Sequence, residues 1–159
     1  MKKAYFAGGC FWGVEYYFQK VAGVISTKVG YMGGHTDNPT YEEVSSHTTG
    51  HAETMEISFD ETKVSYEDLA KLFFEIHDPA QKNRQGPDIG DQYRSVVFYT
   101  DQEQKEIAEK LIEILKAKGD KVVTEVTPAG IFWEAEDYHQ KYYAKNGHSP
   151  YCHIRRRKF

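Results

Sequence analysis

The order of predicted elements in this chain indicates an α+β fold, a ferredoxin-like two-layer sandwich with a mixed β-sheet. The elements alternate as β-α-β-β-α-β-α-β, followed by a short helix and an irregular tail. This order contains split β-α-β units, which place helices against a sheet. Of the 159 residues, 40% are hydrophobic and 28% are charged, which is the balance of a globular protein with a core. We therefore expect a single domain over residues 1–159, with a C-terminal tail from about residue 146.

In the first part of the chain, a helical pattern lies between two strand patterns. Residues 3–7 are a short apolar run, which predicts a buried strand. A helix is predicted to begin just after Cys10 and to end at Gly23, because apolar residues recur there at helical spacing. These residues are Val14, Tyr17, Phe18 and Val21. Residues 24–31 predict a second strand. One face of that strand carries Ile25, Val29 and Tyr31.

Two long loops separate the next elements. The first, residues 32–50, is rich in Gly, Asn and Pro and is long for a passive connection. The strand after it covers residues 51–59, and one parity carries His51, Glu53, Met55, Ile57 and Phe59. Ser65 and Asp68 resemble a capping box. The helix that follows has an apolar stripe of Leu69, Leu72, Phe73 and Ile76. The second loop covers residues 77–92.

The last part of the chain repeats the alternation once more. Residues 94–99 predict a strand, and Asp101 is a predicted helix N-cap. The inner face of that helix carries Ile107, Leu111 and Ile114, with Gly119 as its C-terminal cap. Residues 121–126 predict another strand, and residues 137–145 a short helix.

Charge and hydropathy narrow the classes of function. The net charge of −4 argues against a nucleic-acid-binding protein. The basic run at residues 155–158 is interpreted as a solvated tail. No apolar run approaches the length of a membrane span, and the N-terminus lacks a signal-peptide hydrophobic region. We therefore expect a cytoplasmic monomer without membrane or nucleic-acid partners, and in that compartment structural disulfides are rare.

Cys10 is the first candidate for chemistry. It lies in Gly8-Gly9-Cys10-Phe11-Trp12-Gly13, where a predicted strand gives way to a predicted helix. Unpaired backbone N–H groups and the positive end of the helix dipole favour the thiolate, which is the reactive form. The two aromatic residues that follow predict an apolar pocket beside the sulfur. The alternative is that Cys10 is a small apolar residue in a tight glycine turn, since cysteines are often buried.

Glu53 is the second candidate. Its parity places it with Met55, Ile57 and Phe59, on the face expected to meet the core. A carboxyl group near apolar surface has its charged form disfavoured, so its pKa should rise and it can donate a proton near pH 7. The alternative is that the strand begins later and that Glu53 reaches solvent.

The two long loops supply further polar groups. Tyr41 follows Asn38-Pro39-Thr40 in the first loop, and the second loop leads through Asp88 to Tyr93. Phenol hydroxyls and a carboxylate in an apolar site would orient a polar atom of a substrate. Taken singly, each could equally be a surface or packing residue, because the chain has twelve tyrosines.

Neither a metal nor a bound organic cofactor is predicted. The chain has seven histidines, but their positions and those of the two cysteines do not give a metal-ligand spacing. The sequence also lacks a P-loop and a G-x-G-x-x-G fingerprint.

Cys152 is the remaining candidate, in Ser149-Pro150-Tyr151-Cys152-His153 of the irregular tail. It is either an incidental thiol or a resolving cysteine that reaches an oxidised Cys10.

Several motifs together resemble those of the peptide-methionine sulfoxide reductase A family. Gly9-Cys10-Phe11-Trp12-Gly13 resembles the signature of that family. The later motifs follow in the family's order: Gly30-Tyr31, Gly33-Gly34, Asn38-Pro39-Thr40-Tyr41, Gly50-His51-Ala52-Glu53, Arg84-Gln85-Gly86, Asp88, Gly90, Gln92-Tyr93-Arg94-Ser95 and Glu136-Asp137-Tyr138-His139-Gln140. The match runs from Tyr5 to about Cys152, and its several independent motifs make it specific.

The resemblance implies a ferredoxin-like enzyme that reduces the S epimer of methionine sulfoxide, in proteins and as the free amino acid. It implies that Cys10 is the nucleophile and Glu53 the acid. Phe11 and Trp12 would hold the methyl group of the substrate. The sulfoxide oxygen would be bound by Tyr41 and Tyr93, and Asp88 would help to organise the site. Thioredoxin or another dithiol would be the external reductant.

One departure from the family concerns recycling. Many members carry two recycling cysteines in a glycine-rich tail, whereas this chain has only Cys152 there. The resemblance therefore implies a direct Cys10–Cys152 disulfide. Two other functions are compatible with the residues alone: a thiol peroxidase, and a ferredoxin-like binding module with inert cysteines.

Overall fold

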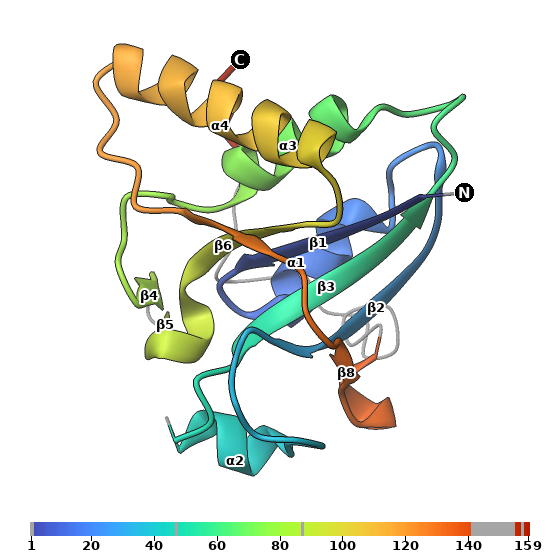
Figure 1. Cartoon of the computed structure of the whole chain (residues 1–159), viewed down its shortest axis with the longest axis vertical. Helices are drawn as coiled ribbons and strands as arrows, with labels where there is room; N and C mark the ends of the chain where they lie inside the picture. Colours follow the sequence, from blue (N-terminus) through green and yellow to red (C-terminus); the bar gives the residue numbers. More distant parts are fainter. Residues whose placement is uncertain (1, 47, 87, 141–154, 157) are drawn as a thin grey trace.

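The computed structural model describes residues 2–46, 48–86, 88–140, 155–156 and 158–159 (Figure 1). Within this part of the chain, six strands form one sheet in the order β7-β6-β1-β3-β2-β8. Their bounds are β1 Lys2–Gly8, β2 Val24–Met32, β3 Ala52–Phe59, β6 Ser95–Tyr99, β7 Glu125–Pro128 and β8 Trp133–Glu134. Neighbouring strands are antiparallel except β6 and β7, which are parallel. The predicted α+β fold with a mixed sheet is confirmed.

Three helices pack against one face of the sheet: α1 (Phe11–Phe18), α3 (Tyr66–Ile76) and α4 (Gln102–Ala117). Register brings Phe6 of β1 opposite Met55 of β3 and Val97 of β6, and all three are fully buried. The predicted stripe of α3 lies in the same core. Ser65 and Asp101 cap α3 and α4 as expected, because each side chain accepts a hydrogen bond from a backbone N–H three residues on.

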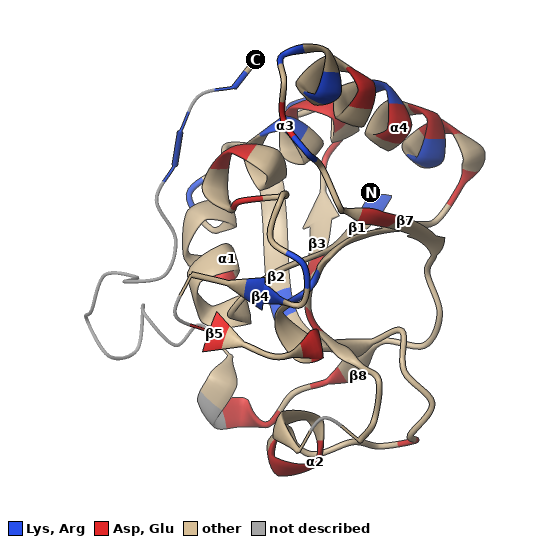
Figure 2. Ribbon diagram, turned by 90° about the vertical axis from the view of Figure 1, so that its left-hand side faces the viewer, with Lys and Arg blue, Asp and Glu red and all other residues tan. Residues whose placement is uncertain are grey.

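The opposite face of the sheet is covered by the chain between β7 and β8. Ala129 and Phe132 of this connection pack on a smaller core that includes Val96 and Phe98. Figure 1 shows the connection crossing in front of the sheet, and Figure 2 shows it on the side away from α1 and α3. Because β3 is therefore covered on both faces, all eight of its residues are buried.

Short elements occupy the two long loops and the end of the last described loop. They are α2 (Tyr41–Ser45), β4 (Arg84–Gln85), β5 (Asp88–Ile89) and the 3₁₀ turns η1 (Asp91–Tyr93) and η2 (Asp137–His139). A full capping box at Thr40 and Glu43 explains where α2 begins. The loops are therefore ordered structures that bring Tyr41, Asp88 and Tyr93 to defined places.

Two boundary predictions were wrong. Helix α1 ends at Phe18 rather than at Gly23. Gly23 instead adopts a left-handed φ of 97° in the turn that leads into β2, a conformation that favours glycine. Strand β7 begins at Glu125 rather than at residue 121, because its pairing with β6 begins there.

Two further predictions need correction, and one strand was missed. Ile25 does not share a buried face with Val29 and Tyr31 but is 59% exposed. A register shift between Val24 and Ser26 breaks the alternation, as a β-bulge does. The helix predicted over residues 137–145 is only the 3₁₀ turn η2 where it is described, and its later residues lie outside the described range. Strand β8 was not predicted.

The basic C-terminal segment is partly anchored rather than wholly solvated. Glu75 of α3 is 5% exposed and accepts two hydrogen bonds from the Arg155 guanidinium, at 2.9 and 3.2 Å. Its second oxygen accepts the backbone N–H of Lys158 at 3.1 Å, and the ring of Phe159 lies against Phe74. The charge of the segment therefore serves to pair a buried carboxylate. None of the helices in the described residues has the length and apolar composition needed to cross a membrane.

Replacing Arg155 by Ala should destabilise the fold, because the nearly buried Glu75 carboxylate would lose its charged partner. We expect a loss of about 1–2 kcal/mol in the free energy of unfolding, less than for a fully buried pair because Arg155 is partly exposed. Urea unfolding measures the effect. Arg156→Ala is the matched control, since Arg156 is exposed and its bond to the Glu75 carbonyl is made by its backbone N–H. Equal midpoints for the two variants would contradict this role for the Arg155–Glu75 pair.

Candidate active site

Cys10 lies where the sequence places it, at the junction of β1 and α1. It is the N-cap residue of α1, and its carbonyl accepts the N–H groups of Gly13 and Val14 at 3.1 and 3.3 Å. Gly9, just before it, has a left-handed φ of 97°, so the chain can turn sharply from strand into helix. The Cys10 side chain is 7% exposed and makes no capping hydrogen bond. The sulfur is thus held at the helix N-terminus.

Glu53 comes from β3 and reaches the same helix N-terminus. Its Oε1 accepts the backbone N–H of Phe11 at 3.2 Å, and the residue is only 1% exposed. Register with β2 pairs Glu53 with Tyr31, which is completely buried. The parity argument for Glu53 is confirmed, and the alternative in which it reaches solvent is wrong.

The protonated form of Glu53 is favoured. Burial raises its pKa well above 4.5, and negative charge at Cys10 and at Asp88 raises it further, against the single hydrogen bond from Phe11. Its other oxygen, Oε2, is buried and lacks a hydrogen-bond partner among the described residues. A protonated carboxyl group would carry its proton there, ready to donate to a bound molecule.

Two tyrosine hydroxyls lie near this acid. Tyr41 is the first residue of α2 and Tyr93 the last of η1, and the two phenols lie close enough for each to influence the pKa of the other. Burial raises the pKa of both phenols, and the charge of Glu53 raises them further. Both therefore stay protonated at neutral pH and can serve as hydrogen-bond donors. Asp88, on β5, is close enough for its charge to act on Glu53.

An aromatic wall completes the site. The rings of Trp12, Tyr41 and His139 lie 4.5–6.5 Å apart, and Phe11 packs beneath them against Tyr31. Phe11 is fully buried, whereas Trp12 is half-buried. Trp12 and the half-buried Tyr41 therefore supply the accessible part of the wall.

His139 fixes the orientation of Trp12. The indole Nε1–H donates to His139 Nδ1 at 3.0 Å, so this ring nitrogen carries no proton. Burial lowers the pKa of His139, against the opposing charge of Glu136, so the neutral ring that this bond needs is favoured.

Glu136 and Gln140 hold the segment that carries His139. Glu136 accepts the Tyr31 hydroxyl and the backbone N–H of Tyr41, each at 3.2 Å. Gln140 accepts the N–H of Val29 at 2.9 Å and donates to its carbonyl at 2.8 Å. These bonds join η2 to β2 and α2, which fixes the wall relative to the sheet.

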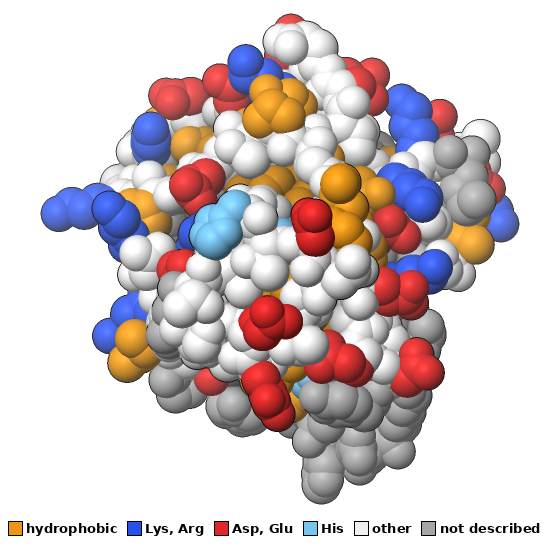
Figure 3. Space-filling model, turned by 60° about the horizontal axis from the view of Figure 1, so that its bottom comes forward, with side chains coloured by type: hydrophobic (Ala, Val, Ile, Leu, Met, Phe, Trp, Pro, Cys, Tyr) orange, Lys and Arg blue, Asp and Glu red, His pale blue; other side chains and the backbone are white. Residues whose placement is uncertain are grey.

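The surroundings of α2 and η2 are acidic. Exposed side chains there include Asp37, Glu42, Glu43, Glu134 and Asp137, and Figure 3 shows Asp and Glu scattered over this end of the molecule. Residues 29–62 contain neither Lys nor Arg. The face beside the aromatic wall is therefore negative.

Seven of the eight predicted site residues gather around the junction of β1 and α1. They are Cys10, Phe11, Trp12, Tyr41, Glu53, Asp88 and Tyr93. Cys152 lies outside the described residues. The sequence analysis assigned no role to His139. The signal that could have found it is the motif Glu136-Asp137-Tyr138-His139-Gln140, which places four polar side chains within five residues at the start of a predicted helix. Among the described residues, three or more His, Cys, Asp or Glu side chains nowhere form a group that could hold a metal ion.

Comparison with known proteins agrees with this geometry. The model of the peptide methionine sulfoxide reductase family matches residues 2–159. The chain belongs to this family. A peptide methionine sulfoxide reductase MsrA of Nautilia profundicola is 58% identical over 152 residues, which cover 96% of this chain and 88% of the relative.

Two solved structures share the fold of this chain. The reduced form of Mxr1 from Saccharomyces cerevisiae superposes with a TM-score of 0.92 at 36% identity, covering 98% of this chain and 92% of Mxr1. A structure of Mxr1 in complex with Trx2 superposes with a TM-score of 0.67 at 24% identity, covering 98% and 89%. The predicted family and fold are confirmed.

Glu53 should make stability depend on pH in a defined direction. A group whose folded pKa is raised stabilises the fold below its unfolded pKa, here 4.5, and this contribution is lost as pH rises through the folded pKa. Glu53→Gln should therefore gain stability over the wild type as pH rises above about 4.5, by at most about 1.4 kcal/mol per pH unit.

Urea unfolding of both proteins across pH 5–9 under reducing conditions measures this difference. Glu134→Gln, at an exposed position of β8, is the control for loss of one negative charge. A difference that stays constant with pH, or that favours the wild type as pH rises, would contradict the raised pKa of Glu53.

Proposed function

We propose that this chain reduces the S epimer of methionine sulfoxide to methionine, in proteins and as the free amino acid. The observation that carries the proposal is the pairing of the buried Glu53 carboxyl with Cys10 at one helix N-terminus. A thiolate and a proton donor side by side are what reduction of a sulfoxide requires. Membership of the family supports the same activity. We propose residues 1–159 as one catalytic domain.

The aromatic wall and the polar groups bind different parts of the substrate. The methyl group of the sulfoxide lies against Trp12, with Phe11 beneath it. The sulfoxide oxygen accepts hydrogen bonds from Tyr41 and Tyr93, whose proximity to Glu53 and raised pKa values support this role. Asp88 keeps Glu53 protonated through its charge. When the methyl group and the oxygen of the sulfoxide are held at these two places, only one epimer has its sulfur oriented for attack by Cys10.

The reductase step moves one oxygen atom. The Cys10 thiolate attacks the sulfoxide sulfur while Glu53 gives its proton to the oxygen. Protonation is needed because an unprotonated oxide is a very poor leaving group. The hydroxyl group then passes to the Cys10 sulfur as the bond between the two sulfurs breaks. Methionine leaves with two more electrons, and Cys10 is left as a sulfenic acid.

Recycling uses two further thiol reactions. The Cys152 thiolate attacks the sulfenic acid, and the Cys10–Cys152 disulfide forms as the hydroxyl group leaves as hydroxide, which takes up a proton from solvent to become water. Thioredoxin, or another dithiol, then reduces that disulfide. The complex of the structural relative Mxr1 with Trx2 supports a thioredoxin as the partner. The scheme uses neither a metal nor a bound organic cofactor, and we propose that it runs in a cytoplasmic monomer.

A single-turnover assay with each epimer tests the reductase step. The wild type should reduce only the S epimer. The Cys152→Ser variant should lose one thiol for each sulfoxide that it reduces, because its reaction stops at the sulfenic acid. Cys10→Ser should abolish the reaction, and Glu53→Gln should slow it by ~10²–10⁴ through loss of general acid catalysis. Activity in Cys10→Ser would overturn the scheme. Faster turnover of hydrogen peroxide than of the sulfoxide would identify a thiol peroxidase instead.

Cys152→Ser separates recycling from reduction. This variant should reduce one equivalent of sulfoxide as fast as the wild type, then stop when thioredoxin is the only reductant. Steady-state turnover with a thioredoxin system measures recycling, and a small dithiol that attacks sulfenic acid directly should restore turnover. Normal thioredoxin-dependent turnover would remove Cys152 from the scheme.

A further inference from the structure

We propose that Arg94 is a positioning residue that holds Tyr93 in register with Glu53. The inference rests on the proposed function, because it concerns the tyrosine that binds the sulfoxide oxygen. Arg94 directly follows Tyr93 in the chain. It would act through the backbone of two segments, without touching the substrate.

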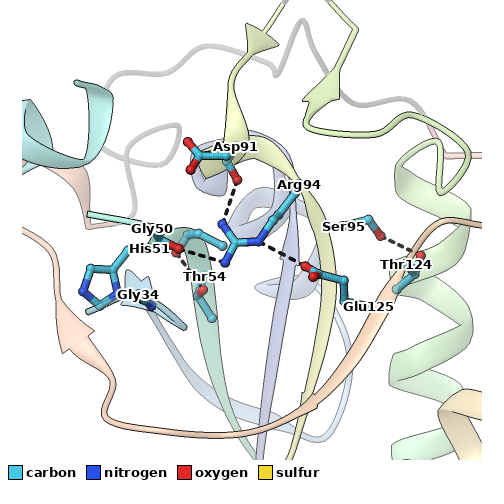
Figure 4. Close-up of polar contacts among 10 residues, drawn as sticks. Gly34, Gly50, His51, Thr54, Asp91, Arg94, Ser95, Thr124 and Glu125 are labelled. Carbon is cyan, nitrogen blue, oxygen red and sulfur yellow. Dashed lines mark hydrogen bonds and ion pairs between the residues drawn. The ribbon is translucent and has the colours of Figure 1, made fainter. Parts of the chain in front are cut away.

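The Arg94 guanidinium makes three contacts at once (Figure 4). Its Nη1 donates to the carbonyl of Asp91 at 2.9 Å, and its Nη2 donates to the carbonyl of Gly50 at 2.9 Å. Its Nε donates to Glu125 at 3.1 Å. Each of the three nitrogens thus has its own acceptor, and the planar fork of arginine can satisfy all three together.

The two carbonyls belong to the segments that carry the site. Asp91 begins η1, which ends at Tyr93. Gly50 lies three residues before Glu53, at the entry to β3. The guanidinium therefore ties the turn that presents a hydroxyl to the strand that presents the acid. Such a tie sets the separation of Tyr93 and Glu53 through the backbone of the two segments.

The loop beneath the guanidinium is shaped to fit it. Gly33 and Gly50 have left-handed φ values of 90° and 73°. A Cβ on Gly33 would lie 3.4 Å from Arg94 Nη2 and closer still to Phe98. His51 holds the same loop, because its Nδ1 accepts the N–H of Gly34 at 3.0 Å and its Nε2 lies 2.7 Å from the Thr36 carbonyl. The Gly50 carbonyl thus has a fixed position from which it accepts Arg94.

The third contact, with Glu125, belongs to the surface. The Arg94 side chain is 18% exposed, whereas that of Glu125 is 58% exposed. An exposed pair of this kind contributes little to stability. The two carbonyl contacts and the Glu125 contact can therefore be separated by mutation, with Glu125→Gln as the matched control.

Loss of the two Arg94 bonds to backbone carbonyls should slow the reduction, because the Tyr93 hydroxyl must be placed within hydrogen-bonding distance of a single sulfoxide oxygen. A displacement of about 1 Å at a positioning group can slow a reaction by ~10²-fold. Cys10 belongs to the turn between β1 and α1, and none of the three groups that accept hydrogen bonds from the Arg94 guanidinium lies in that turn. Its thiol reactivity should therefore be independent of Arg94.

The experiment compares Arg94→Ala, Arg94→Lys and Glu125→Gln with the wild type in single-turnover reduction of methionine S-sulfoxide. We expect Arg94→Ala to be slowed by ~10–10²-fold, and Arg94→Lys by an intermediate factor, because one ammonium cannot reproduce the fork. Glu125→Gln should match the wild type. The alkylation rate of Cys10 as a function of pH should be the same in all four proteins.

Rescue by added guanidinium ion gives a second readout that a loss of folding would not show. Arg94 lines a cavity of about 300 Å³ together with Lys82, Asn83, Ser95 and Glu125, through which the small ion can enter. Guanidinium chloride, well below denaturing concentration, should restore several-fold of the lost rate to Arg94→Ala. The same concentration of sodium chloride should not, and neither salt should speed the wild type.

Two results would overturn the inference. One is an Arg94→Ala variant that reduces the sulfoxide as fast as the wild type. The other is a slow Arg94→Ala variant whose Cys10 alkylation profile shifts and whose rate guanidinium does not restore, which indicates general disruption. If Arg94→Ala does not fold, the test rests on Arg94→Lys. A reduction rate and a Cys10 alkylation profile of Arg94→Lys that equal those of the wild type would reject the positioning role. A wild type inactive on sulfoxide would reject the proposed function instead.

Discussion

The structure depends on placing one carboxyl group out of water at the start of one helix. The Glu53 carboxyl group is shielded from solvent. It is buried in the central strand and accepts the N–H of Phe11, the first residue of α1. Burying a charged carboxylate with one hydrogen bond is unfavourable, so the neutral acid is the stable form. The same bond fixes β3 against the residue after Cys10. Burial thus keeps the acid protonated, and the bond to Phe11 places it beside the residue that carries the sulfur.

Around this contact, the groups of the site that lie outside α1 and β3 come from loops, and several of these loops are fastened to the sheet. Glu136 joins Tyr31 of β2 to Tyr41 of α2, and His139 orients Trp12. Arg94 joins η1 to the entry of β3. These are hydrogen bonds between buried or half-buried partners, which resist rearrangement because breaking one leaves an unsatisfied group. A long loop can then hold its side chains in positions as well defined as those on a strand. A small substrate, recognised by one oxygen atom and one methyl group, requires such defined positions.

Local pattern predicted the elements wherever one periodicity governed several residues. The stripe of α3, the caps at Ser65 and Asp101 and the parity of β3 follow from rules that act over a few neighbours. The same rules failed where a partner strand decides. Ile25 has the parity of a buried residue, yet the bulge in its pairing with β3 turns it outward. Strand β8 has two residues and exists only because β2 is beside it.

The amino-acid sequence by itself determined the fold class and the helix N-terminus at Cys10, because each depends on residues close together in the chain. It also carried the family's motifs in order. For Glu53, the parity of its strand left burial and exposure both open, and the tertiary structure decided for burial. Only the tertiary structure decided that His139 holds Trp12 across 127 positions, that Arg94 bridges two loops, and that Glu75 receives the basic C-terminal segment. Such contacts leave no periodic trace in the sequence. They arise when the sheet brings distant segments within hydrogen-bonding distance, and geometry then selects the partners.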